Sequence, residues 1–138
     1  MAYYSIFPEK DTTIYSHPDR INMNTGRDEI LELVEEKATV GEIYYPSRIL
    51  IKFKNKEIRD AITTKIQKEI NTSNCKIGLQ LFSTEHKNLA QTQNIEVFAL
   101  SQSWDEGTGR YSNLPTSSNG CSWIFRNNTT VATEWLGV

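Results

Sequence analysis

Hydrophobic and polar residues alternate along several short segments of the chain, as they do in β-strands with one buried face. The clearest segment is 47–53, in which both isoleucines and Phe53 share one parity and both basic residues fall on the other. Weaker versions of the same pattern predict six further strands: 11–15, 28–36, 76–86, 94–104, 120–126 and 129–135. We expect a tight turn at Asn127 and Asn128, between the last two strands, because asparagine tolerates positive φ.

A different period appears after the clearest strand. Four isoleucines recur every four residues: Ile58, Ile62, Ile66 and Ile70. This spacing places them on one face of an amphipathic helix, which we predict at about residues 55–72 with Asn55 capping its start. The narrow apolar stripe is suited to closing one end of a sheet, and docking of Ile58, Ile62 and Ile66 on a partner is the alternative.

Many short strands separated by clusters of turn residues favour a mainly β fold. We predict an antiparallel two-sheet, jelly-roll-like sandwich with one inserted α-helix. A chain of 138 residues is long enough for one core, so residues 1–138 are expected to form a single domain. The apolar run at Trp135 and Leu136 makes both residues candidates for an interface, and suggests either the amino-terminal part of a longer chain or a tail that packs on a neighbour.

Charge and composition argue against several kinds of partner. The 15 Lys and Arg residues are balanced by 17 Asp and Glu residues, so the chain lacks the positive field that attracts nucleic acid. No run approaches the roughly 20 apolar residues of a membrane span, so no membrane association is expected. Cys75 and Cys121 lie far apart and have no cysteine or histidine near them in sequence, so neither a metal nor a cofactor is expected.

Residues with catalytic potential are few. Asp105 and Glu106 are adjacent, and on a strand their carboxylates face opposite sides instead of flanking a bond as a glycosidase requires. His17 and His86 lack the sequence context of a nucleophilic triad, and the glycines at 107–109 are not followed by the lysine of a phosphate loop. The protein is therefore not expected to be an enzyme.

Five short motifs occur in an order that resembles a known family. They are an Asp-x-x-Ile run from Asp11, an Asn-x-Gly turn from Asn24, an Arg-led strand ending in Phe from Arg48, the Trp-Asp-Glu run from Trp104, and a second tryptophan at Trp123. This order is similar to that of DNRLRE domains, jelly-roll sandwiches that are similar to carbohydrate-binding modules. Residues 5–33 and 101–123 more closely resemble the amino-terminal domain of large virion structural proteins of contractile-tailed marine phages.

The closer likeness covers about residues 2–123, and "WDEGTG" at 104–109 is its most specific part. It implies that Trp104 is a core residue in a structural corner and that Asp105 and Glu106 bond backbone amides of loops. Trp123 belongs to the same corner. The inserted helix departs from the simple carbohydrate-binding pattern.

Two features of this corner leave alternatives open. Arg48 is expected either to pair with Asp105 or Glu106 or to remain a solvated charge at the end of its strand. Strict alternation along 94–104 points Trp104 away from the face that carries the β-branched residues. Either a β-bulge at 101–103 resets the parity, or both faces of this strand are covered, by the helix or by a neighbouring subunit.

The resemblance implies a non-enzymatic component of a phage virion. We expect an anchoring or adaptor domain that attaches a fibre, collar or tail-associated component to the neck or baseplate, with other virion proteins and further copies of the chain as partners. The alternative is a carbohydrate-binding module for host surface glycans. In that alternative Tyr44, Tyr45 and Tyr111 stack on sugar rings.

Overall fold

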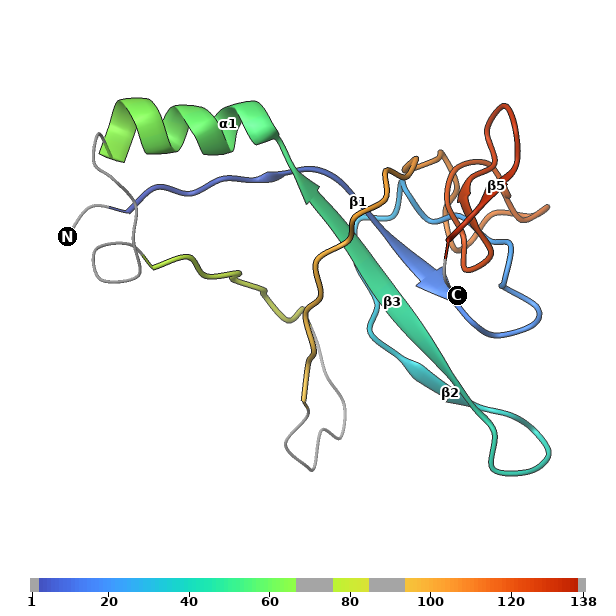
Figure 1. Ribbon diagram of the computed structural model, residues 1–138. Coiled ribbons are helices and arrows are strands. Elements are labelled where there is room, and N and C mark those ends of the chain that lie inside the picture. Colours follow the sequence, from blue (N-terminus) through green and yellow to red (C-terminus); the bar gives the residue numbers. More distant parts are fainter. Residues whose placement is uncertain (1–2, 67–75, 85–93, 137–138) are drawn as a thin grey trace.

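The computed structural model describes residues 3–66, 76–84 and 94–136, except for the side chains of residues 65 and 66. These residues form two antiparallel sheets and one short helical segment (Figure 1). The first sheet has the order β1-β3-β2, with β1 at Pro8–Tyr15, β2 at Glu35–Lys37 and β3 at Tyr44–Phe53. The second sheet pairs β4, Phe125–Asn127, with β5, Thr133–Glu134. The prediction of a mainly β, antiparallel fold is confirmed at this level.

The predicted strands at 11–15 and 47–53 are confirmed and form the centre of the first sheet as β1 and β3. Their antiparallel register places Thr12 opposite Leu50 and Ile14 opposite Arg48. Strand β2 pairs with β3 only along Tyr44–Pro46. Within the described residues, the rest of β3 therefore has a strand on one edge only.

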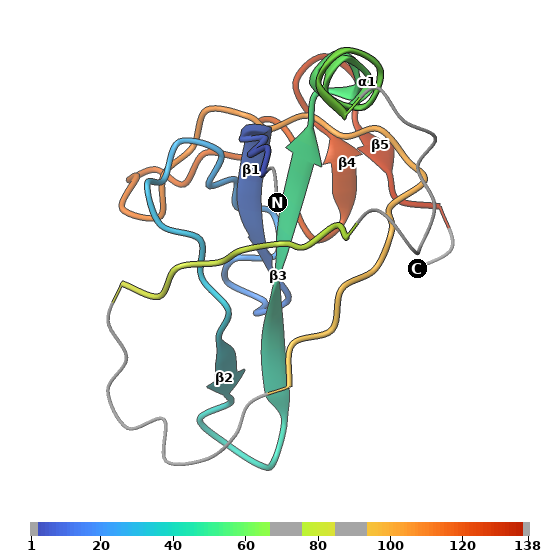
Figure 2. The ribbon, with the colours of Figure 1, turned by 90° about the vertical axis from the view of Figure 1, so that its left-hand side faces the viewer.

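A small core lies between the first sheet and the β4–β5 hairpin. Ile14, Trp104 and Cys121 are its buried members, and three half-buried side chains pack against them: Leu50, Trp123 and Trp135. Figure 2 shows β4 and β5 beside the part of β3 that pairs with β1, and away from β2. The alternation of β1 and β3 explains this arrangement, because Ile14 and Leu50 point to the same face of the sheet.

Several predicted strands differ from the structure. Only the end of 28–36 joins a ladder, as part of β2, and 120–126 and 129–135 contribute only the short strands β4 and β5. Asn127 ends β4 and a longer loop follows it, so the predicted two-residue turn is wrong. Residues 76–84 and 94–104 form no ladder among the described residues. An alternating pattern specifies the faces of a strand, but a ladder also needs a neighbour for its backbone groups.

The predicted helix is present, but it begins differently from the expectation. Asn55 is the first helical residue of α1, Asn55–Asp60, and Lys54 is the N-cap and makes no side-chain capping bond. The helix continues as a π-helical turn, Ala61–Ile66, and lies beyond the end of β3 (Figure 1). Ala61 is the buried residue of this segment, while Ile58 is exposed and Ile62 half-buried. The side chain of Ile66 and residues 67–72 lie outside the described part of the chain.

Candidate functional site

Three segments that are distant in sequence meet around one buried asparagine. We call this region the Asn24 corner: residues 24–26, 104–109 and 117–122. The Asn24 side chain is fully buried, and its Nδ2 donates to the carbonyl oxygens of Glu106, at 2.5 Å, and Cys121, at 3.0 Å. Its Oδ1 accepts from the backbone amides of Gly26, at 3.2 Å, and Gly109, at 2.9 Å. Both donors and both acceptor positions of the amide are therefore used, as a buried polar group requires.

Glycines allow the three segments to approach this closely. A Cβ atom at Gly109 would overlap the carbonyl oxygen of Asn24, and one at Gly26 would overlap the carbonyl oxygen of Glu106. Gly107 lies against the Asn24 side chain and has a φ of +78°, a value that side chains rarely allow. The glycine-rich sequence is thus a packing requirement of the corner.

We predict that Gly109→Ala destabilises the fold by about 1–3 kcal/mol, because the added methyl group must displace backbone in a packed region. Gly78→Ala is the matched control, since a Cβ there meets no atom within 4 Å. Urea unfolding of both variants measures the difference. Equal midpoints would show that the segments of the corner do not pack as closely as described.

The two carboxylates of the Trp-Asp-Glu run have different roles. The Oε1 atom of Glu106 accepts a hydrogen bond of 2.9 Å from the backbone amide of Asp11, in strand β1. Asp105 contributes its backbone: its amide donates to the carbonyl of Arg126 at 3.0 Å, and its carbonyl accepts from the amide of Cys121 at 2.7 Å. Within the described residues, the Asp105 carboxylate bonds no loop amide and Glu106 bonds a strand amide instead, so the implied bonding of loop amides is wrong for this part of the chain.

Trp104 lies in the core and is 5% exposed. The ammonium of Lys10 lies 4.3 Å from the centroid of its ring and also donates a hydrogen bond to the Trp104 carbonyl. The irregular backbone at 101–103 separates this buried indole from Phe98 and Leu100, which are exposed. Residues 94–104 form no strand, so the parity conflict is removed without a bulge, and the helix does not cover Phe98 or Leu100.

Arg48 contacts an aromatic ring. Its guanidinium carbon lies 4.4 Å from the centroid of Trp123, and within the described residues it makes no ion pair with Asp105 or Glu106. Of the two alternatives left open by the sequence, pairing with Asp105 or Glu106 is therefore wrong. The register explains the contact, because Arg48 is opposite Ile14 and so shares the face of the sheet on which Trp123 packs.

We predict that Arg48→Ala lowers the free energy of unfolding by about 0.5–1 kcal/mol through loss of the cation–π contact. Arg48→Lys should recover much of this loss, and Arg27→Ala, at an exposed arginine that makes no ion pair within the described residues, is the control for removal of a charge. Chemical denaturation measures all three variants. An Arg48→Ala protein as stable as the parent would show that the stacking contributes nothing.

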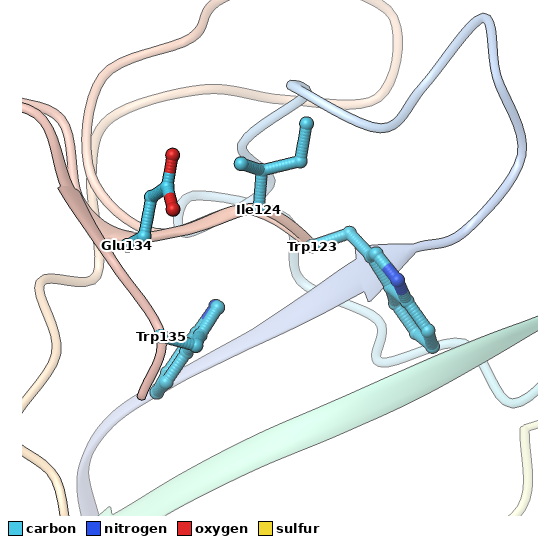
Figure 3. A pocket seen from close by; sticks show the side chains of 4 residues that line it. All are labelled: Trp123, Ile124, Glu134 and Trp135. Carbon is cyan, nitrogen blue, oxygen red and sulfur yellow. The ribbon is translucent and has the colours of Figure 1, made fainter. Parts of the chain in front are cut away.

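A hollow of about 190 Å³ lies beside this contact and is lined by four residues: Trp123, Ile124, Glu134 and Trp135 (Figure 3). The two indoles lie on the side of the β1–β3 sheet, whereas Glu134 and Ile124 point away from it. The Trp135 indole donates to the carbonyl of Ser122 at 2.9 Å. Of the two candidate interface residues at this end, Trp135 is thus held against the core and Leu136 is exposed.

A second, more open hollow of about 290 Å³ lies beside Tyr111, and seven residues line it: Asp28, Glu29, Ile30, Glu32, Arg110, Tyr111 and Ser112. The Tyr111 amide donates to the Asp28 carboxylate at 2.8 Å. Below the hollow, the Tyr15 hydroxyl donates to Glu32 at 2.6 Å, and burial together with this bond raises the pKa of Tyr15. The tyrosine is therefore a neutral hydrogen-bond donor.

The three candidate glycan-stacking tyrosines do not share one surface hollow. Tyr44 lies with its ring 5.6 Å from the Lys37 ammonium, on the β2–β3 ladder. Tyr45 follows it on β3, so it points to the opposite face of the sheet, where its ring contacts His17 edge-on at 4.9 Å. Tyr111 lines a hollow together with charged residues, among them Asp28 and Arg110.

Groups suited to catalysis or metal binding are sparse in the part of the chain that the structure describes. Burial raises the pKa of the Cys121 thiol to about 12, so it remains protonated at neutral pH. Nδ1 of His17 accepts from the Asp19 amide at 3.2 Å, and His86 lies outside the described residues. Among residues 3–66, 76–84 and 94–136, no three His, Cys, Asp or Glu side chains are grouped to hold a metal ion. The same ranges contain no helix that is long and apolar enough to span a membrane.

Comparison with family models, with curated proteins and with solved structures found no match to this chain.

Proposed function

We propose that the protein is a non-enzymatic structural component of a phage virion. In this role it is an anchoring or adaptor domain that attaches a fibre, collar or tail-associated component to the neck or baseplate. The observation that supports an assembly role is the outward exposure of large apolar side chains on 76–84 and 94–100. Extended apolar surface of this kind is typical of proteins that bury it on partners. The motif order around the Asn24 corner supports the virion context by resemblance.

The fold that we propose for this role is a jelly-roll-like sandwich. Two antiparallel sheets support this proposal, as does the core of Ile14, Trp104 and Cys121 beside them. The alternating segments at 76–84 and 94–100 supply further strands in the assembled state. A structural corner with every amide group of Asn24 satisfied gives such a module a rigid frame.

Mass spectrometry of purified virions, together with electron microscopy of particles with and without the protein, tests this proposal. We expect the protein in purified particles at a defined stoichiometry, and density lost from the neck or baseplate when it is absent. Detection only in lysates of infected cells, and never in washed particles, would contradict the virion role.

A carbohydrate-binding module is the second candidate, and the hollow beside Tyr111 favours it. An exposed aromatic ring next to carboxylates and Arg110 is a surface on which a sugar can stack and hydrogen-bond. Screening the folded protein on arrays of bacterial surface glycans tests this role. Binding that is lost in Tyr111→Ala and kept in Tyr44→Ala would support it, and silence across the array would remove it.

A further inference from the structure

Two described segments have the apolar pattern of strands but no strand beside them. Eight of their large apolar side chains are exposed: Ile77, Leu79, Leu81, Phe82, Ile95, Val97, Phe98 and Leu100. Val97 is 72% exposed and Phe98, the next residue, is 81% exposed. Neighbouring residues of an extended chain point to opposite faces, so 94–100 is apolar on both faces. A strand of this kind is stable only with cover on each side.

The first sheet offers a free backbone edge. The Pro46 carbonyl accepts from Ser16, next to β1, whereas the Ser47 amide donates to Val34, next to β2. Successive residues of a strand point their amide and carbonyl groups to opposite edges. The amides and carbonyls of Ile49 and Ile51 therefore point to the edge opposite β1. No strand occupies that edge among the described residues. An unpaired edge of this kind is a template for an added strand.

Within the described residues, the chain does not fill this edge itself. The backbone amide of Asp11 points away from β3 and donates to the Glu106 carboxylate at the outer edge of β1. Residues 101–103 join 94–100 to Trp104, which is fixed in the core. Figures 1 and 2 show 94–100 on the side of β3 away from β1, yet the segment forms no ladder with β3.

The exposed area is also larger than a compact monomer allows. The chain exposes 11231 Å², whereas a compact monomer of 15.8 kDa exposes about 7,300 Å² by the usual scaling with mass. The difference exceeds the roughly 800 Å² that each partner buries in a stable interface of standard size. Enough surface is therefore present for an extensive contact between copies.

We propose that residues 94–100 of one copy add as a strand to the free edge of β3 in a second copy, so that the protein is a strand-exchanged homo-oligomer. Each copy carries both the edge and the strand, which makes the contact self-complementary. Side chains of the incoming strand then pack beside their cross-strand neighbours on β3 and bury part of the exposed apolar area. This contact between copies does not depend on the virion role, and either proposal can fail without the other.

Light scattering coupled to size exclusion, over a wide range of protein concentration, is the first test. We expect a mass that is a multiple of 15.8 kDa. Val97→Asp should raise the dissociation constant ~100-fold or more, because a buried unpaired charge disfavours association. Val131→Asp is the matched control, since Val131 is 71% exposed but lies in the β4–β5 loop, and it should leave the mass unchanged. A wild-type monomer at every concentration would overturn the proposal.

Disulfide trapping then separates exchange between copies from pairing within one chain, and it does not depend on how well Val97→Asp folds. A Val97→Cys chain is mixed with a tagged Ile51→Cys chain and oxidised. A disulfide-linked product containing one tagged and one untagged chain is expected, and it should be absent when Val131→Cys replaces Val97→Cys. A cross-link that forms only inside a chain carrying both cysteines would show that the segment pairs in cis and would contradict the exchange.

Discussion

Replacing Asn24 with alanine is expected to lower the free energy of unfolding by about 4 kcal/mol, because buried amides and carbonyls that it satisfies lose their partner together. The carbonyls of Glu106 and Cys121 and the amide of Gly109 have no other hydrogen bond assigned in the corner. This loss is large against the total stability of a domain, about 5–15 kcal/mol. Guanidinium unfolding followed by tryptophan fluorescence measures it. Asn22→Ala, at an exposed position two residues away, is the control and should be neutral.

Asn24→Asp distinguishes lost hydrogen bonds from lost volume, because the side chain keeps its shape. At neutral pH its carboxylate would face the two carbonyl oxygens that the amide now binds, and burial would raise the pKa of the new acid. A raised pKa in the folded state means that stability falls as pH rises above the unfolded value of about 4. The variant should therefore be more stable near pH 4 than at pH 7, relative to Asn24→Ala. A pH-independent difference would contradict this account of the corner.

Trp104→Ala is expected to cost about 3–5 kcal/mol, since it removes a large buried side chain from a small core and leaves a cavity. The ring packs with Ile14 and Cys121 and lies under the Lys10 ammonium. Thermal and chemical unfolding should both show the loss. Phe7→Ala, at a residue that is 76% exposed, is the aromatic control and should change the midpoint little. Retention of the parent melting temperature, with a loss of glycan binding alone, would reassign Trp104 to a sugar site.

Sequence patterns predicted the elements in which one face is clearly apolar and the other polar. Strands β1 and β3 followed from alternation, and the isoleucine repeat predicted the helix that begins at Asn55. Segment 28–36 fits neither period cleanly, and only its last residues pair with β3. Pairing depends on a neighbour as well as on a pattern, and the same reason explains why 94–104 has the sequence of a strand without a ladder.

The candidate site was only partly accessible from sequence. The tryptophans and glycines of the corner form an unusual run in the sequence, but the sequence marks Asn24 only as the start of a turn. Its central role depends on partners 82 to 97 residues away, which no local pattern reports. The sequence leaves Arg48 either paired with a carboxylate or solvated at the end of its strand, and neither alternative includes an aromatic partner. Arg48 contacts Trp123 because the β1–β3 register places it opposite Ile14, on the face where Trp123 packs. This register depends on the pairing of two distant segments.

The long sequence separation of the Asn24 contacts also bears on how fast the protein folds. Its side-chain hydrogen bonds to the two distant segments span 82, 85 and 97 positions, so the corner forms only after a large loop has closed. Closure entropy is lost before those bonds compensate for it, and chains rich in such contacts fold slowly for their size. The β1–β3 pairing spans fewer residues and should form earlier. Variants in the corner should therefore mainly accelerate unfolding, which makes the corner the part of the fold that determines the lifetime of the native state.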